Sequence, residues 1–417
     1  MKKIAVIGSG VSGMVCARLL STQHDVHLFE KRDRLGGHTA TKEVEYQGKT
    51  YQVDTGFIVY NDRTYPNFIK LMDKLGIQGK PTEMSFSVHN KDTGLEYNGH
   101  DLNTLFAQRR NLVRPKFWRL IREIVRFNKT AKQRFAEDDF SANETLGSFL
   151  DEQNFSDFFA EHYILPMGAA IWSTSLQKMK EFELKFFVRF FYHHGLLNIS
   201  DRPQWYVIPG GSKQYIAPLL SGLEANIHVD ADIKKVTREN GRVQLHFADT
   251  VSEFDEVVLA CHSDQALNLL GDASAEESSV LSAIPYAKNS VILHTDTDLL
   301  PKRPLAWAAW NYLLDNNESR PAAVTYNMNI LQGIEAPCTF CVTLNQPIDE
   351  DKVIGQYQYA HPVFNTQSMA AQQRRKEICG LQHTHFAGAY WYNGFHEDGV
   401  RSAVDVAARF GISLDDL

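Results

Sequence analysis

The sequence predicts an α/β protein in which a domain built on a parallel sheet is joined to a second domain of mixed helices and strands. Three observations predict this fold class. A short apolar run at the amino terminus leads directly into a glycine-rich turn and a helical pattern. Two apolar runs far along the chain are typical of buried strands, and a long central stretch is helical and aromatic. At 417 residues and 43% apolar content, the chain can bury the cores of two domains.

The amino-terminal segment has the order strand, glycine turn and helix. Residues 3–7 are apolar and partly β-branched, and Gly-Ser-Gly-Val-Ser-Gly follows at once. Gly8 permits the tight turn, Gly10 lets the backbone approach a pyrophosphate, and Gly13 lets the helix pack close to the sheet. Ser12 lies inside the same turn. This order predicts a Rossmann-like site for a dinucleotide, with its diphosphate at the helix amino terminus.

An acidic residue stands where the second strand should end. The apolar run 25–29 leads into Glu30, which lies 22 positions after Gly8. Its carboxylate can accept both hydroxyls of an adenosine ribose and would repel a 2′-phosphate, so NADP is disfavoured. Lys31 follows directly. We include Lys31 among the predicted cofactor contacts, although it can equally be a solvated loop charge, as can Arg32.

A second glycine pair follows the acid. Gly36 and Gly37 precede His38, and this order after an acidic residue resembles the extended motif of the amine-oxidase-like flavoproteins. The resemblance implies FAD as the cofactor, because NAD dehydrogenases usually lack the second pair. The permissive backbone of both glycines would allow another close approach to the diphosphate or the ribityl chain.

A distant apolar run is predicted to return the chain to the parallel sheet. Residues 254–261 are rich in valine and leucine, as in a strand buried on both faces. A hairpin precedes this run. We expect the backbone of Val236, in that hairpin, to meet the adenine.

The carboxyl-terminal segment resembles the closing motif of flavin-binding folds. Residues 384–389 read as a strand that reaches Gly388, and Asp398, Gly399 and Val400 open the last helix. In such a motif, backbone amides at a helix amino terminus face the negative pole of the isoalloxazine ring. Fixed N–H dipoles at that place would favour flavin reduction.

The positions of these segments predict a discontinuous cofactor domain. We expect a Rossmann-like FAD-binding domain of the glutathione-reductase or amine-oxidase type, assembled from residues 1–75, 202–275 and 380–417. Two insertions, residues 76–201 and 276–379, would form a mixed α+β substrate domain.

A basic segment stands out in the first insertion. Apolar residues recur at helical spacing between residues 117 and 135, which predicts an amphipathic helix. The segment from Arg109 to Arg134 holds ten basic residues and one acid, in a chain of net charge −7. Either it contacts anionic lipid head groups, each basic residue contributing about 1 kcal/mol, or it is a solvated helix face balanced by acids elsewhere.

Aromatic residues gather in both insertions. Residues 163–173 form an apolar stretch broken by a proline and a glycine, which suggests backbone close to a ligand. Such residues would line an elongated apolar cavity over the flavin. We place His38, Trp172 and Trp310 near the ring, although each of them can equally be a core residue. The sequence identifies no proton acceptor.

Composition disfavours several other classes of protein. A net charge of −7 argues against a dedicated nucleic-acid binder. Five cysteines, an odd number, do not resemble a secreted disulfide framework. Cys338 and Cys341 form a C-x-x-C that we expect on one strand, without the further ligands of a metal site.

No stretch approaches the ~18–20 apolar residues needed to span a bilayer. We therefore expect a cytoplasmic protein, with the inner face of the membrane as a second location.

Motifs outside the glycine turns carry a more specific resemblance. They are residues 64–67 (Thr-Tyr-Pro-Asn), 84–88 (Met-Ser-Phe-Ser-Val), 170–173 (Ala-Ile-Trp-Ser), 202–205 (Arg-Pro-Gln-Trp) and 307–311 (Trp-Ala-Ala-Trp-Asn). Over nearly its whole length the chain is similar to bacterial FAD-dependent amine-oxidase-like oxidoreductases. It is also similar to the amino-terminal flavin domain of plant cyclopropane fatty acid synthases.

The resemblance implies hydride transfer to FAD from an unsaturated or methylated acyl chain, on a lipid or a small molecule. In the plant enzymes a methyltransferase follows the flavin domain, which implies a methyltransferase partner here. Two alternatives stay open: an amine or polyamine oxidase, and a non-catalytic FAD-bound partner of a lipid methyltransferase. The first would need an acidic or aromatic amine-binding pocket, which the sequence does not reveal.

Overall fold

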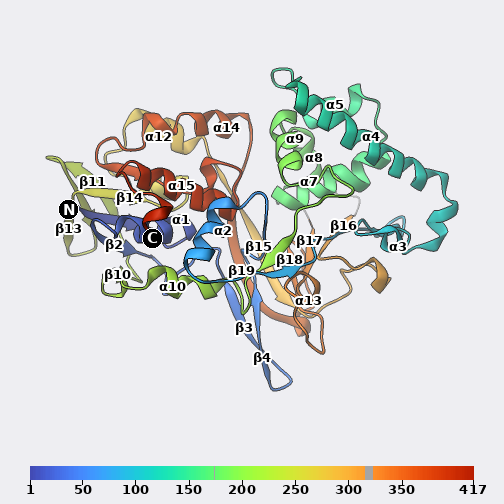
Figure 1. Ribbon diagram of the computed structural model, residues 1–417, viewed down its shortest axis with the longest axis horizontal. Coiled ribbons are helices and arrows are strands. Elements are labelled where there is room, and N and C mark those ends of the chain that lie inside the picture. Colours follow the sequence, from blue (N-terminus) through green and yellow to red (C-terminus); the bar gives the residue numbers. More distant parts are fainter. Residues whose placement is uncertain (173, 315–322) are drawn as a thin grey trace.

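The computed structural model describes residues 1–172, 174–314 and 323–417 of an elongated α/β molecule (Figure 1). A five-stranded sheet lies at the end that carries both termini, in the order β10-β2-β1-β14-β20, with all neighbours parallel. Its strands are β1 (Lys3–Ile7), β2 (Asp25–Phe29), β10 (Ile227–His228), β14 (Glu256–Leu259) and β20 (Thr384–Phe386). The predicted α/β class is confirmed.

Two helices from opposite ends of the chain pack together on this sheet, namely α1 (Val11–Leu20) and α15 (His396–Ala408). Nine of the ten residues of α1 are buried, because the sheet and α15 enclose it. The surrounding core draws its buried residues from 4–72, 208–284 and 371–414. Parallel neighbours need crossover connections, which explains why the strands of one sheet lie so far apart in the sequence.

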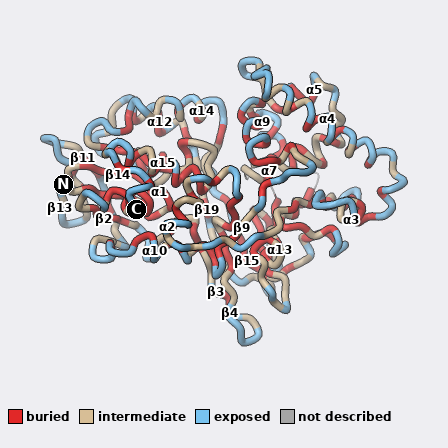
Figure 2. Tube along the Cα trace, in the orientation of Figure 1, coloured by how far each residue is buried: buried red, intermediate tan, exposed pale blue. Residues whose placement is uncertain are grey.

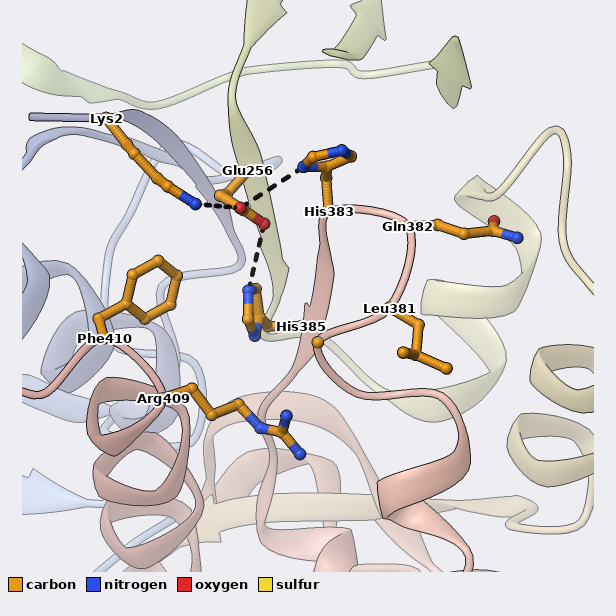
Figure 3. Close-up of a pocket in the computed structure, with 9 residues that line it drawn as sticks. Lys2, Glu256, Leu381, Gln382, His383, His385, Arg409 and Phe410 are labelled. Atoms are coloured by element: carbon orange, nitrogen blue, oxygen red, sulfur yellow. Dashed lines mark hydrogen bonds and ion pairs between the residues drawn. The ribbon is translucent and has the colours of Figure 1, made fainter. Parts of the chain in front are cut away.

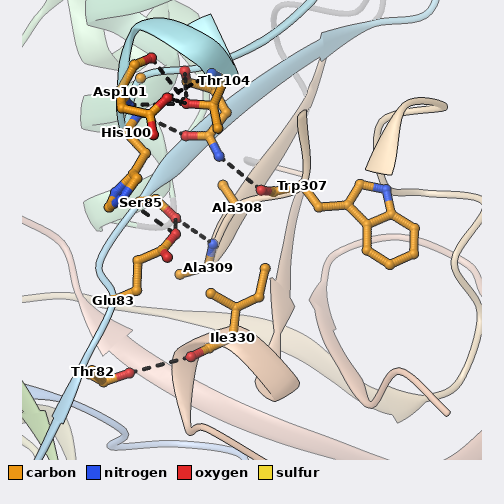
Figure 4. Close-up of polar contacts among 12 residues, drawn as sticks. Thr82, Glu83, Ser85, His100, Asp101, Thr104, Trp307, Ala308, Ala309 and Ile330 are labelled. Carbon is orange, nitrogen blue, oxygen red and sulfur yellow. Dashed lines mark hydrogen bonds and ion pairs between the residues drawn. The ribbon is translucent and has the colours of Figure 1, made fainter. Parts of the chain in front are cut away.

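A seven-stranded sheet forms the middle of the molecule, in the order β19-β15-β18-β17-β16-β7-β8. Its strands are β7 (Phe86–Asn90), β8 (Glu96–Asn98), β15 (Tyr286–His294), β16 (Trp310–Leu314), β17 (Val324–Asn327), β18 (Cys341–Leu344) and β19 (Val353–Pro362). Only β7 and β16 pair in parallel. Beside this pair, the Ala309 amide donates to Ser85 Oγ at 2.9 Å and the Asn98 side chain donates to the Trp307 carbonyl at 2.8 Å (Figure 4).

A helical layer covers the upper right of this sheet (Figure 1). Its helices are α4 (Pro115–Glu137), α5 (Leu146–Glu152), α6 (Asp157–Phe159), α7 (Leu165–Trp172), α8 (Leu176–Lys180) and α9 (Leu184–His193). α4 contains the predicted amphipathic helix: Phe117, Leu120 and Phe127 are buried at helical spacing. Pro115 occupies its first turn, where no backbone N–H is needed, and Asp138 ends it in the left-handed conformation.

The apolar stretch at residues 163–172, whose proline and glycine suggested backbone close to a ligand, is helical. A π turn over Ala160–Ile164 runs directly into α7. This wider turn precedes Pro166, which has no amide to give to a helical hydrogen bond. Gly168 serves packing, since a Cβ there would stand 2.2 Å from Met179 Sδ. Ser173, at the end of the predicted stretch, lies outside the described residues.

Smaller elements complete the fold. The remaining strands are β3 (Thr41–Tyr46), β4 (Lys49–Asp54), β5 (Tyr60–Asn61), β6 (Lys80–Thr82), β9 (Trp205–Val207), β11 (Lys235–Glu239), β12 (Arg242–His246) and β13 (Val251–Phe254). The remaining helices are α2 (Pro66–Lys74), α3 (Leu102–Leu105), α10 (Ile216–Leu220), α11 (Ser263–Leu269), α12 (Ala275–Ser282), α13 (Met328–Leu331) and α14 (Thr366–Gln373). Exposed residues concentrate at the β3–β4 tip and in the turn before α4 (Figure 2).

Two sequence expectations need correction. Cys338 precedes the strand that was expected to carry both cysteines, because β18 begins only at Cys341, and both thiols are free. The run at residues 254–261 is divided, since Phe254 ends β13 and β14 begins at Glu256. Within the described ranges, no helix combines the length and the hydropathy that crossing a bilayer requires.

Candidate functional site

The glycine turn after β1 is built by close backbone contacts. Gly8 has a φ of +105°, and its N–H donates to the Phe29 carbonyl at 2.8 Å. A Cβ on Gly13 would stand 1.8 Å from the Gly8 carbonyl oxygen, so only glycine lets α1 start this close to β1. A Cβ on Gly10 would meet no atom within 4 Å. Gly10 therefore faces open space at the amino terminus of α1, where a diphosphate can approach.

Glu30 is fixed at the end of β2 by its neighbours. Its Oε2 accepts from both the N–H (2.9 Å) and the Oγ (2.6 Å) of Ser9, and its Oε1 accepts from the Arg32 N–H at 2.9 Å. Oε1 therefore keeps a further lone pair for a ribose hydroxyl, whereas both lone pairs of Oε2 are taken by Ser9. The Lys31 side chain is 82% exposed, and its Nζ lies 3.8 Å from Asp232. Thus the acid stands at the glycine turn, while the Lys31 ammonium points to solvent.

The second glycine pair lies against the first turn. The Gly36 N–H donates to the Ser9 carbonyl at 3.0 Å. A Cβ on Gly37 would stand 3.1 Å from the Gly10 Cα, so the two glycine turns approach each other backbone to backbone. His38 follows, and its Nε2 is buried without a hydrogen-bond partner among the described residues. We call these two turns together with Glu30 the cofactor cradle.

Residues near the carboxyl terminus close the cradle. Ser402 Oγ accepts from the Gly388 N–H at 2.9 Å and lies 3.4 Å from Ser12 Oγ. A Cβ on Gly399 would stand 2.5 Å from Val11 Cγ1, so α15 can cross α1 only with glycine at this position. The structure therefore brings Ser12, Gly388 and Gly399 together across almost the whole length of the chain.

The free amides of α15 differ from the predicted ones. The Gly399 N–H already donates to the Phe395 carbonyl at 3.1 Å. Val400 is completely buried, one residue further into the helix. A helix leaves the amides of its first turn without intrahelical acceptors, and here these belong to His396, Glu397 and Asp398. The amides available to an anionic group are thus one to three residues earlier than Gly399.

The hairpin predicted to meet the adenine lies next to the cradle. Val236 is completely buried, and its carbonyl accepts from the Gly271 N–H at 2.8 Å. The segment just before it is tied to the end of β2, because the Ala231 N–H donates to the Glu30 carbonyl at 2.8 Å. The structure thus places residue 231, five positions before Val236, against Glu30, a contact that no spacing in the sequence indicated.

A buried hydrogen-bond chain that was not anticipated lies beside the cradle. The Tyr215 hydroxyl is 2.5 Å from Thr39 Oγ1 and 2.8 Å from His396 Nε2. The His396 ring stacks on Phe57 with centroids 3.6 Å apart. Burial lowers the pKa of His396 to about 3, so this imidazole is neutral at physiological pH. The glycine pair Gly210-Gly211, just before Tyr215, is the sequence feature that could have pointed to this buried hydrogen-bond chain.

Two acids near the cradle are buried. Burial raises the pKa of Asp54 to about 6, although hydrogen bonds from Thr41 and Ser212 oppose the rise. Burial also raises the pKa of Asp398 to about 7. Asp398 accepts from the Phe395 N–H at 2.9 Å and so caps α15. Neither carboxyl is a simple solvated anion, and both adjoin backbone that shapes the site.

His38 meets the middle sheet in a group of rings. Its centroid lies 5.2 Å from Tyr359 and 5.4 Å from His361, both on β19. The Tyr359 hydroxyl is 2.8 Å from Thr55 Oγ1, and the Asn289 amide is 3.0 Å from His361 Nδ1. Burial lowers the pKa of His361 to about 4 and that of His38 well below its usual range. The cradle thus faces neutral imidazoles where the two sheets meet.

The two tryptophans lie away from this ring group. Trp172, at the end of α7, is surrounded by phenylalanines of the helical layer: Phe182, Phe186, Phe187, Phe190 and Phe191. Trp310, on β16, packs edge-on against Tyr326 at 4.8 Å. Both indole N–H groups are buried, and no described residue accepts from them. Among the described residues, no ring contact joins His38 to either tryptophan, although α7 packs on β16.

One cavity lies on the opposite edge of the parallel sheet. It has a volume of about 420 Å³, and its lining includes Lys2, Glu256, His383 and His385 (Figure 3). Glu256 binds Lys2 Nζ at 2.6 Å and lies 3.3 Å from His385 Nε2. These residues stand where the strands begin, whereas the cradle stands where β1 and β2 end. Ligands of such sheets bind at the carboxyl ends of strands, so this cavity is separate from the cofactor site.

The cradle fits a flavin dinucleotide. It offers open space at Gly10, an acid held at the end of β2, free amides at the start of α15, and an orphaned buried nitrogen on His38. These are the groups that a diphosphate, a ribose and the polar edge of a flavin need. In the described part of the chain, no three His, Cys, Asp or Glu side chains are placed to hold a metal ion.

Comparisons with known proteins agree with this geometry. Residues 11–328 match the family model described as flavin containing amine oxidoreductase. A stretch of 55 residues is 47% identical to the 4,4'-diapolycopen-4-al dehydrogenase of Metabacillus indicus, covering 13% of this chain and 10% of that protein. The match to this curated relative thus spans only one tenth of its length.

Solved structures with the same fold align along almost the whole chain. They include a CLA-producing fatty acid isomerase from P. acnes (17% identity), the cyclohexylamine oxidase of Brevibacterium oxydans IH-35A (14%) and a putrescine oxidase bound to putrescine (15%). Each comparison covers 98% of both chains with a TM-score of 0.68. At these identities the likeness establishes the fold.

Proposed function

The chain belongs to the family of flavin-containing amine oxidoreductases and is an FAD-dependent oxidoreductase, and from this premise we propose that it oxidises or desaturates an unsaturated or methylated acyl chain. Bound FAD would supply the hydride acceptor for such a reaction. The residues of this chain would hold the acyl group and the cofactor in contact. Hydride transfer depends on positioning more than on a side-chain base.

The observation that carries the proposal is the apolar aromatic wall of the helical layer. Within the described part of the chain, every ring contact of Trp172 is with a phenylalanine, and this cluster continues to Phe364 and Phe395. Most of these phenylalanines are buried in one apolar core, and an acyl chain is the ligand class that such apolar surroundings favour. The histidines where the two sheets meet are neutral, so they offer no charge to an ionic substrate.

The comparisons add support of unequal weight. One structural neighbour is a fatty acid isomerase, and the curated relative that matches over 55 residues is a 4,4'-diapolycopen-4-al dehydrogenase. Two other neighbours are oxidases of small amines, so the family relationship does not by itself choose the substrate. The acyl alternative and a methyltransferase partner are also what the resemblance to the flavin domain of plant cyclopropane fatty acid synthases implies, and both belong to the proposal.

The test is the visible spectrum of the purified holoprotein under anaerobic conditions. Phospholipids with unsaturated or methylated acyl chains should bleach the flavin band, whereas matched saturated, unbranched phospholipids should not. Cyclohexylamine and putrescine serve as the competing substrates. Bleaching by an amine alone, or a band that stays oxidised with every acyl substrate, would contradict the proposal.

A further inference from the structure

We propose that the outer face of α4 and the turn before it form a docking surface for a bilayer rich in anionic phospholipid. The docking face consists of Leu102, Leu112, Val113, Trp118 and Val125 together with Arg110, Arg122 and Lys129. The proposal concerns where the molecule binds, and it stands independently of the reaction at the flavin.

Large apolar side chains are unusually exposed in this segment. Val113 is 83% exposed, Leu102 76%, and Leu112 48%. Trp118 is 44% and Val125 47% exposed, on the following helix. Single exposed apolar residues are ordinary on a protein surface, but five within 24 positions mark an interaction site.

The turn before α4 is held in a defined shape. A 3-10 turn over Arg109–Val113 joins α3 to α4, and the Trp118 indole N–H donates to the Leu112 carbonyl at 2.9 Å. The Trp118 ring also packs against Phe106 at 5.3 Å. The exposed ring therefore stands over the turn that presents Leu112 and Val113. A bilayer interface favours such an indole, whose apolar body can enter the lipid while its N–H keeps a partner.

Basic residues alternate with the apolar ones on the same helix face. Trp118, Arg122, Val125 and Lys129 follow one another at intervals of four, three and four, which places them along one stripe of α4. The opposite face, with Phe117, Leu120 and Phe127, is buried in the helical layer. The stripe is thus free to lie flat on a surface, with Arg and Lys reaching head groups beside the apolar side chains.

The charge of this face is not neutralised within the described structure. Of the two acids of α4, Glu123 is buried, accepts from Ser156, and takes Arg119 and Arg126 as ion-pair partners, and Glu137, the last residue of the helix, accepts from the Gln133 side chain. Among the described ion pairs, none includes Arg110, Arg122 or Lys129. Because the whole chain carries a net charge of −7, an anionic membrane would repel most of it and attract this end. Charge therefore selects both the lipid and the orientation.

The position of the face suits a flat partner. The turn between α3 and α4 lies at the end of the molecule farthest from both termini (Figure 1), and its trace is exposed there (Figure 2). A projecting end with apolar tips fits a bilayer surface better than a protein groove. No binding to either kind of vesicle is the outcome that a protein partner for this face would give.

The experiment is flotation of the holoprotein with vesicles of phosphatidylcholine alone or mixed with phosphatidylglycerol. We expect binding to the mixed vesicles, release by high salt, and little binding to phosphatidylcholine. Arg122→Glu/Lys129→Glu should lower the partition coefficient at least about tenfold, and Val113→Asp should lower it as well. The matched controls Lys49→Glu/Lys376→Glu and Val251→Asp change exposed residues elsewhere and should bind as the wild type. Retention of the flavin band shows that each variant is folded.

Three results would overturn the proposal. They are equal binding to both kinds of vesicle, no binding to the mixed vesicles, and equal losses in the docking-face variants and their controls. Equal losses would mean that overall charge, rather than this face, sets the affinity.

Discussion

A Cβ atom on Gly13 would stand 1.8 Å from the carbonyl oxygen of Gly8, which makes the start of α1 intolerant of any side chain. Gly10, between them, faces open space and has φ −62° and ψ 173°, a conformation open to alanine. Gly13 is therefore needed for the fold itself, whereas Gly10 is needed for the approach of the cofactor.

Gly10→Ala should leave the flavin-free protein within about 1 kcal/mol of wild-type stability, because only the helix N-cap preference changes. Its affinity for FAD should fall at least about tenfold, since the new methyl group occupies the path of the diphosphate. Gly13→Ala should lose about 1–3 kcal/mol or more before any cofactor is added. Urea unfolding and FAD titration measure the two effects. Wild-type FAD affinity in Gly10→Ala would show that the diphosphate binds elsewhere.

Tyr215→Phe should destabilise the protein by about 1–3 kcal/mol, because it leaves the buried Thr39 hydroxyl and His396 Nε2 without a partner. Tyr192→Phe, at a half-exposed ring of α9, should stay within about 0.5 kcal/mol of the wild type. Denaturant unfolding of the flavin-free proteins gives both values. Equal stability of the two variants would mean that the hydrogen bonds of the Tyr215 hydroxyl contribute nothing to the free energy of unfolding.

Asp398 should make stability depend on pH. Its pKa in the folded protein is about 7, above the ordinary 3.8, so its favourable contribution is complete below pH 3.8 and is lost as the pH rises through 7. The flavin-free wild type should therefore lose about 2–3 kcal/mol from this group between pH 5 and pH 8. Asp398→Asn, which can still accept from Phe395, should flatten that dependence. The exposed Asp151→Asn is the control and should keep the wild-type slope.

The role of the buried indole N–H groups of Trp172 and Trp310 can be tested separately from that of the cradle. Trp172→Phe and Trp310→Phe remove buried N–H groups for which no described residue is an acceptor, and each leaves a smaller ring in an apolar core, so stability should fall by about 1–3 kcal/mol and the flavin band should persist. If these groups bind the polar end of an acyl substrate, flavin reduction should slow about tenfold, the loss of one hydrogen bond. Anaerobic stopped-flow reduction measures this rate. Wild-type rates in both variants would remove the tryptophans from the substrate site.

Much of the cofactor domain was predictable because its signals are local. The order of strand, glycine turn and helix at residues 3–20 follows from short-range spacing, and so does the acid at the end of β2. The amphipathic pattern of α4 is equally local, since helical periodicity alone assigns its buried face. These local patterns did not identify the substrate, because the residues that line a pocket come from segments that no spacing rule connects.

Tertiary structure decided which distant segments meet. The sequence placed Ser12 and Gly388 at two glycine turns, but only the crossing of α1 and α15 brings both to Ser402 Oγ. It also could not show that Ala231 meets Glu30, because these residues are about 200 positions apart and only the folded chain brings them together. Local periodicity determines whether a segment forms a helix or a strand, whereas long-range packing determines which residues its side chains contact. For this reason the sequence alone determined an FAD-type fold, and only the folded chain determined the shape of its site.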